Sequence, residues 1–247
     1  MWWPGTGSRS AFSNVNPIIV ALDVPSAAPA RALVEALDEQ AGFYKVGMEL
    51  YAGEGLAYVR ELAGLGKNVF LDLKLYDISE TVKRAVAVIA QSGARFLTVH
   101  GSNAVMRAAV EGRGSSDLKL LAVTVLTSFD QDDLAELGYP TPLQDLVALR
   151  AHHAKECGID GIVCSAREAA AVRAIIGANG IIVTPGVRSA TATAGDQKRV
   201  ATPAEAIEAG ANYVVIGREI SRATEPAAEY RRILTAIDST QSSFSRR

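Results

Sequence analysis

The sequence predicts a single-domain (β/α)8 TIM barrel, and three observations lead to that prediction. Short apolar, β-branched runs recur eight times along the 247 residues. Amphipathic segments with helical spacing, such as PARALVEALDEQAG and AEAIEAGA, separate most of these runs. Several segments end in glycine, which suits the left-handed residue that closes a helix. Near-continuous apolar strands alternating with helices indicate a parallel sheet covered by helices, and eight such units in this length fit a barrel.

The expected strands occupy residues 17–23, 43–48, 68–74, 95–100, 119–126, 159–165, 180–186 and 212–218. An open, doubly wound sheet is the structural alternative. That fold usually carries a glycine-rich fingerprint after its first strand, whereas the first strand here ends in LDVPS. We therefore expect a barrel over residues 15–238, a flexible N-terminal extension over 1–14 and a polar C-terminal tail over 239–247.

Composition narrows the functional classes. The formal net charge is −2 and the Lys and Arg residues are scattered, so neither a nucleic-acid-binding stripe nor a membrane-binding basic patch is expected. The chain has no apolar run of about 18 residues, so no transmembrane helix is expected. The two cysteines, Cys157 and Cys164, give no disulfide framework and no paired metal-ligand spacing. This usage is typical of a reducing compartment, and we expect a cytoplasmic protein.

The active sites of this fold lie at the carboxyl ends of the strands, and the third expected strand carries charges there. The stretch VFLDLKLYDISETV places Asp72, Lys74 and Asp77 inside or just beyond an apolar run. Residues two apart share one face of a strand, so Asp72 and Lys74 point the same way, and Lys45 on the neighbouring strand can join them. A buried ion pair that only locks the barrel is the alternative, but such pairs contribute little net stability. Lysines among the acids also argue against a metal site, so none is expected.

The loops after strands 7 and 8 of a barrel often bind phosphate. Strand 8 ends in IGREI, where Gly217 lets the backbone approach closely and Arg218 offers a bidentate guanidinium. The loop after strand 7, PGVRSATATAGDQKRVATP, is long and contributes Arg188 and Gln197. These residues predict an anion site beside the charged cluster.

With these residues assembled, the chain resembles the orotidine 5'-phosphate decarboxylase family, of the bacterial kind. The segment DLKLYDISETV is similar to the family signature, an Asp-x-Lys-x-x-Asp-Ile core followed by Thr-Val. The motifs ALDVP, KVG, VTVLTS, TPGVR with AGDQKR, and VIGREI follow in the family's order, and the resemblance covers about residues 17–235. There is one departure, because Ser79-Glu80 stands where the family often has Pro-Asn. It adds a negative charge near the place where the resemblance implies contact with a second subunit.

The resemblance implies decarboxylation of orotidine 5'-monophosphate to uridine 5'-monophosphate, the last step of de novo UMP synthesis, with no cofactor and no metal. It implies a catalytic tetrad in which Lys74 donates the proton to C6, and a homodimer with shared active sites, into which Asp77, Ile78 and Thr81 reach from the neighbouring subunit. The implied catalytic residues are Lys45, Asp72, Lys74 and Asp77, and the implied substrate-binding residues are Asp23, Lys45, Ile78, Thr81, Thr127, Ser128, Arg188, Gln197, Gly217 and Arg218. Asp23 and Lys45 would contact the ribose, and Thr127 and Ser128 the pyrimidine.

Two other hypotheses about the function stay open. A magnesium-dependent sugar-phosphate lyase or synthase of the same barrel suprafamily shares the Asp-x-Lys-x-x-Asp pattern. Those relatives are similar to one another in carrying an acid, as a metal ligand, where this chain has Lys45. A non-catalytic phosphate- or nucleotide-binding barrel is the reading from a different class, and the loss of a tetrad member would indicate it.

Overall fold

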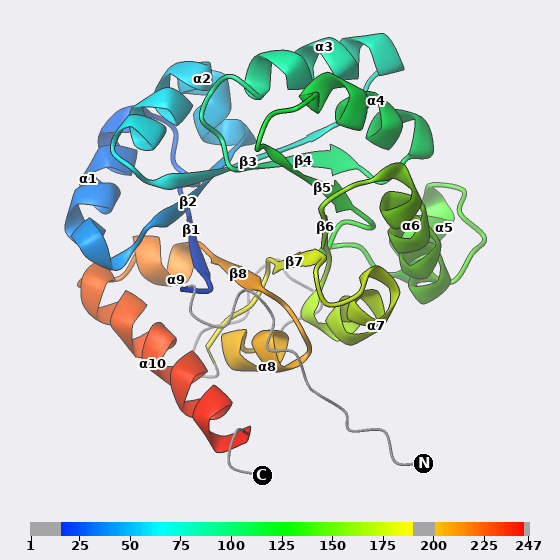
Figure 1. Cartoon of the computed structure of the whole chain (residues 1–247). Coiled ribbons are helices and arrows are strands. Elements are labelled where there is room, and N and C mark those ends of the chain that lie inside the picture. The colour runs from blue at the N-terminus through cyan, green and yellow to red at the C-terminus, as the bar shows by residue number, and fades with distance from the viewer. Residues whose placement is uncertain (1–15, 190–200, 245–247) are drawn as a thin grey trace, which may run out of the picture.

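The computed structural model describes residues 16–189 and 201–244, and these residues form a closed barrel of parallel strands (Figure 1). Each strand pairs with the next along the chain, and β8 closes the barrel against β1. The strands are β1 (Ile18–Ala21), β2 (Phe43–Gly47), β3 (Asn68–Leu75), β4 (Phe96–His100), β5 (Lys119–Val123), β6 (Gly161–Val163), β7 (Ile181–Thr184) and β8 (Tyr213–Ile216). The predicted (β/α)8 barrel is confirmed, with each strand inside or overlapping its expected range.

Helices form a ring outside the strands (Figure 1). They are α1 (Ala27–Leu37), the 3-10 turn η1 (Asp38–Gln40), α2 (Met48–Gly64), α3 (Ser79–Ile89), α4 (Asn103–Arg113), α5 (Gln131–Glu136), α6 (Leu143–Cys157), α7 (Ala166–Ile176), α8 (Pro203–Glu208), α9 (Arg218–Ser221) and α10 (Pro226–Phe244). The last helix therefore runs across position 238, where the sequence suggested the end of the barrel domain. In the part of the chain that the structure describes, no helix is long and apolar enough to cross a membrane.

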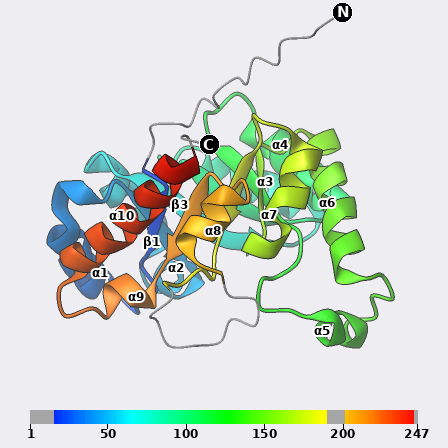
Figure 2. The ribbon, with the colours of Figure 1, turned by 90° about the horizontal axis from the view of Figure 1, so that it is seen from below.

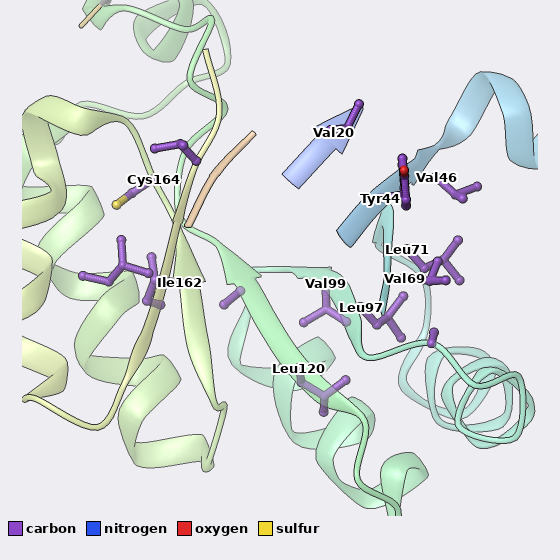
Figure 3. Close-up of a cluster of buried hydrophobic side chains, with 14 of the residues drawn as sticks. Val20, Tyr44, Val46, Val69, Leu71, Leu97, Val99, Leu120, Ile162 and Cys164 are labelled. Carbon is purple, nitrogen blue, oxygen red and sulfur yellow. The ribbon is translucent and has the colours of Figure 1, made fainter. Parts of the chain in front are cut away.

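The outward faces of the strands pack against the helices. Val20, Val69, Leu97 and Leu120 are all fully buried in this layer, which also contains Cys164 (Figure 3). Strands that are apolar on both faces are expected where helices cover one side and other strands cover the second. This layer holds the helices in place but contributes nothing polar to the barrel interior.

The inward faces form a second, smaller apolar layer in which aromatic rings meet. Phe43 lies 5.0 Å from Phe96 and 5.5 Å from Tyr213 between ring centroids, and Phe70 lies 6.0 Å from Phe96. These rings fill the amino-terminal half of the barrel and serve as its floor.

Above this floor the inward face becomes polar. Inward positions recur every second residue, so Lys45 follows Phe43, Asp72 follows Phe70 and Thr98 follows Phe96. These polar residues lie toward the carboxyl ends of the strands. In Figure 2 this end of the barrel can be found from α5 and α9, which follow β5 and β8 in the chain.

Candidate active site

A cavity of about 320 Å³ opens at the carboxyl ends of the strands. It is lined by a charged wall from β1, β2 and β3, an apolar base, and the loops after β5, β7 and β8. The lining residues are Ala21, Asp23, Lys45, Asp72, Lys74, Val123, Leu126, Thr127, Ser128, Val163, Pro185, Gly186, Val187, Arg188, Val215, Ile216, Gly217, Arg218 and Glu219. The structure thus brings nine of the expected site residues to one cavity of a single chain.

The charged wall alternates acid and base across three neighbouring strands. Lys45 Nζ donates to Asp23 Oδ1 at 2.6 Å and lies 4.0 Å from Asp72 Oδ2. Lys74 Nζ donates to Asp72 Oδ1 at 2.9 Å. Asp72 therefore stands between two ammonium groups, with its side chain only 15% exposed. Opposite charges at these distances attract one another and hold the side chains in this arrangement.

A local irregularity in β3 gives Lys74 its position. The pairing of β3 with β4 shifts between Leu71 and Leu75, and Lys74 has a φ of 51°, which is unusual for a residue other than glycine. The Lys74 N–H donates to the Thr98 hydroxyl at 2.9 Å, and that hydroxyl in turn donates to Asp72 Oδ1 at 2.9 Å. The buried Thr98 side chain thus holds both the bulged backbone and the carboxylate.

Gly47, at the end of β2, leaves room for the ion pair beside it. A Cβ at this position would lie 2.9 Å from Lys45 Nζ and 3.1 Å from Asp23 Oδ1. Any larger residue would therefore displace the ammonium group or its partner. The glycine therefore leaves this ion pair undisturbed.

Loops after β5, β7 and β8 bring to the cavity the residues expected to bind the pyrimidine and an anion. Arg188, after β7, and Arg218, at the start of α9, both line the cavity, and so does Gly217 between β8 and α9. Thr127 and Ser128 line it from the loop after β5. Gln197 lies outside the described residues.

Asp77, Ile78 and Thr81 do not line the cavity of their own chain. Asp77 is exposed, and its Oδ1 accepts a hydrogen bond from the Ile78 N–H at 2.6 Å. The Ile78 side chain is 72% exposed and the neighbouring Tyr76 is 68% exposed. The tetrad is therefore represented in one chain by Lys45, Asp72 and Lys74 alone.

The segment between Lys74 and Asp77 rests on β4 through an aromatic stack. The Tyr76 ring lies 4.1 Å from the His100 ring at an interplanar angle of 28°. Burial, and secondly the nearby Arg150 charge, lower the pKa of His100 below its ordinary value. The imidazole is thus neutral near pH 7 and stacks on the Tyr76 ring as an uncharged aromatic group.

Sequence reasoning missed three residues of the site, Thr98, Gly47 and Glu219. Thr98 could have been found from its register, since it stands two residues after Phe96 on the inward face of β4. Gly47 lies within the KVG motif, but only the three-dimensional distances reveal the contact it avoids. Glu219 follows Arg218 directly and carries no pattern that distinguishes it from a surface acid.

The chain is similar in sequence to proteins of one known family. The family model described as "Orotidine 5'-phosphate decarboxylase / HUMPS family" matches residues 16–233. An orotidine 5'-phosphate decarboxylase of Rhodopseudomonas palustris (strain BisA53) is 55% identical over 194 residues, which cover 78% of this chain and 83% of that protein. The enzyme of the same name from Methylobacterium radiotolerans is 57% identical over 194 residues, covering 78% and 84%.

Solved structures show the same architecture. The crystal structure of orotidine 5'-phosphate decarboxylase from Lactobacillus acidophilus has a TM-score of 0.79 and 34% identity, and the match covers 90% of this chain and 99% of that one. An uncharacterized conserved protein from Geobacillus kaustophilus has a TM-score of 0.78 and 40% identity, covering 90% and 100%. Both matches span nearly the whole barrel.

Proposed function

Because the chain belongs to the orotidine 5'-phosphate decarboxylase / HUMPS family, we propose that it is the carboxy-lyase that converts orotidine 5'-monophosphate to uridine 5'-monophosphate and CO2. The reaction would be the last step of de novo UMP synthesis and would take place in the cytoplasm. The single observation that carries the proposal is the arrangement of Asp72 between Lys45 and Lys74 on the wall of the cavity. A pyrimidine carboxylate placed against this wall meets both a fixed negative charge and a proton donor.

Asp72 would act on the ground state. Breaking the bond between C6 and the carboxylate releases neutral CO2 and leaves the electron pair on C6. A substrate carboxylate lying beside Asp72 is repelled by it, and this repulsion disappears as the charge moves from the carboxylate to C6. The hydrogen bond from Thr98 and the two ammonium groups keep the Asp72 carboxylate in place.

Lys74 would act on the transition state. Its ammonium group stabilises the negative charge developing at C6 and then donates a proton to that carbon, so that hydrogen replaces CO2. Lys74 becomes a neutral amine in this step and regains its proton from solvent. No electron acceptor is needed because the chain's own charges act at the reacting carbon, and we infer that the reaction is cofactor-independent.

The phosphate of the substrate would lie between Arg188 and Arg218, which line the same cavity as the charged cluster. We expect Arg218→Ala to lower kcat/KM for the nucleotide by about 100-fold or more, because a charge-assisted contact with the phosphate is lost. The effect on the phosphate-free nucleoside orotidine should stay within a few-fold. Steady-state kinetics with both substrates measure this, and equal losses on the two would contradict the phosphate role of Arg218.

We further propose a homodimer with shared active sites. Tyr76 and Ile78 expose apolar side chains directly beyond β3, and Met48, at the end of β2, is 64% exposed. Apolar groups gathered at one end of the barrel are typical of a surface covered by a partner. In such a dimer the partner's cavity would be completed by Asp77, Ile78 and Thr81. These three residues do not line the cavity of their own chain.

The rival magnesium-dependent lyase or synthase fits this site poorly. Lys45 Nζ bonds to Asp23 and faces Asp72, so a protonated amine occupies the place where a divalent cation would need an acid. Among residues 16–189 and 201–244, no three His, Cys, Asp or Glu side chains are grouped to hold a metal ion.

Product analysis after incubation with orotidine 5'-monophosphate tests the proposed decarboxylation. Equal amounts of uridine 5'-monophosphate and CO2 are expected, and unchanged substrate would contradict it.

A further inference from the structure

The Glu219 carboxylate joins three elements beside the part of the cavity that Arg188 and Arg218 line. Glu219, on α9, accepts a hydrogen bond through Oε2 from the Ser189 N–H at 3.2 Å, and through Oε1 from Arg232 Nη2 at 3.0 Å. The same Arg232 nitrogen, on α10, donates to Ser189 Oγ at 2.9 Å. The start of the loop after β7 is therefore tied to α9 and α10 at a single point.

The residues joined at this point are sequence neighbours of the two arginines that line the cavity. Ser189 directly follows Arg188, and Glu219 directly follows Arg218. The Arg188 N–H donates to the Ala201 carbonyl at 3.0 Å, which fixes the backbone on the other side of Arg188. The carboxylate of Glu219 thus sets the separation between the backbones that carry Arg188 and Arg218.

The charge of Glu219 needs a counterion where it stands. It lines the cavity, and its side chain is only 13% exposed. An uncompensated carboxylate there would repel an anion bound by the two arginines. Arg232 supplies a positive charge that Glu219 shares with Glu229, to which Arg232 donates through Nη2 to Oε1 at 2.5 Å and through Nε to Oε2 at 2.9 Å.

We propose that Glu219 and Arg232 are positioning residues for phosphate recognition. Glu219 fixes Arg188 relative to Arg218, and Arg232 anchors Glu219 while offsetting part of its charge. The proposal rests on the proposed function, because it takes the anion between the two arginines to be the phosphate of a nucleotide. It assigns a role to two residues that need not touch the substrate.

Calorimetric binding of uridine 5'-monophosphate and of uridine to the full chain tests this role. Glu219→Ala and Arg232→Ala should each weaken nucleotide binding by about tenfold, the effect expected for losing a charge-assisted hydrogen bond, and should change uridine binding less than twofold. Glu219→Gln keeps an acceptor for the Ser189 N–H without the charge, and its loss should be smaller than that of Glu219→Ala. Arg231→Ala is the matched control, since the neighbouring Arg231 bonds instead to Gln40.

The ratio of the two affinities separates positioning from general stability. A network that only stabilises the fold would leave this ratio at its wild-type value, and an unchanged ratio in Glu219→Ala and Arg232→Ala overturns the proposal. If Glu219→Ala does not fold, an unchanged ratio in Arg232→Ala and Glu219→Gln overturns it equally. Failure of the proposed function looks different, because the wild-type protein itself would then bind uridine 5'-monophosphate no more tightly than uridine.

Discussion

Replacing Lys74 by alanine is expected to lower turnover of orotidine 5'-monophosphate by about 10⁴-fold or more, because one change removes both the proton donor and the cation at the developing carbanion. The neighbouring groups should stay in place, since Asp72 keeps its bond from Thr98 and its contact with Lys45. Binding of uridine 5'-monophosphate should therefore change by less than about tenfold, because the substitution leaves intact Arg188 and Arg218, which are proposed to bind the phosphate. Steady-state kinetics and calorimetry on the same preparation measure the two quantities.

Lys155→Ala serves as the control for this experiment. Lys155 lies on the outer helix α6 and donates to the Ile175 carbonyl at 2.9 Å, so its loss should leave turnover unchanged. If Lys74→Ala retains a substantial fraction of wild-type turnover, Lys74 is not the proton donor. The proton would then have to come from another group or from water.

A heterodimer with Lys74→Ala in one subunit and Asp77→Ala in the other is expected to keep about half of the wild-type activity, although each homodimeric variant should be almost inactive. In a symmetric dimer with shared sites, one of its two sites would combine the intact Lys74 of one subunit with the intact Asp77 of the other. Co-expression with two different affinity tags isolates the heterodimer, and the turnover per dimer is then measured. The experiment tests whether Asp77, which lies outside the cavity of its own chain, serves the site of the partner.

The matched control pairs Lys74→Ala with Asp72→Ala. These two residues bond to each other within one chain and belong to the same site, so no combination of the two variants restores a complete site. An active Lys74→Ala/Asp72→Ala heterodimer, or an inactive Lys74→Ala/Asp77→Ala heterodimer, would contradict the proposed shared sites.

The barrel could be predicted from the sequence because its signal is repeated. Eight apolar runs of strand length, separated by helical segments, leave few other arrangements, and the structure confirms all eight in order. The polar strand ends follow from the same pattern, since Lys45, Asp72 and Arg218 interrupt or end apolar runs. The general position of the cavity therefore needed no three-dimensional information.

The detailed geometry could not be predicted in this way. Strict alternation places Asp72 and Lys74 on one face, but their contact in the structure depends on a bulge, a positive φ at Lys74 and the hydroxyl of Thr98 on another strand. No local sequence signal marks a positive φ at a lysine. The contact between Glu219 and Arg232 joins two surface-like charges from different helices, and only the packing of α9 against α10 brings them together.

We propose that the charges of this barrel alone, without a metal or cofactor, decarboxylate the nucleotide. The most direct test is to add orotidine 5'-monophosphate to protein dialysed against EDTA and to follow the absorbance of the pyrimidine. We predict a steady fall in absorbance as the substrate becomes uridine 5'-monophosphate, at the same rate as in protein that was not treated with EDTA. No change in absorbance, or a fall that appears only when Mg²⁺ is restored, would contradict the account.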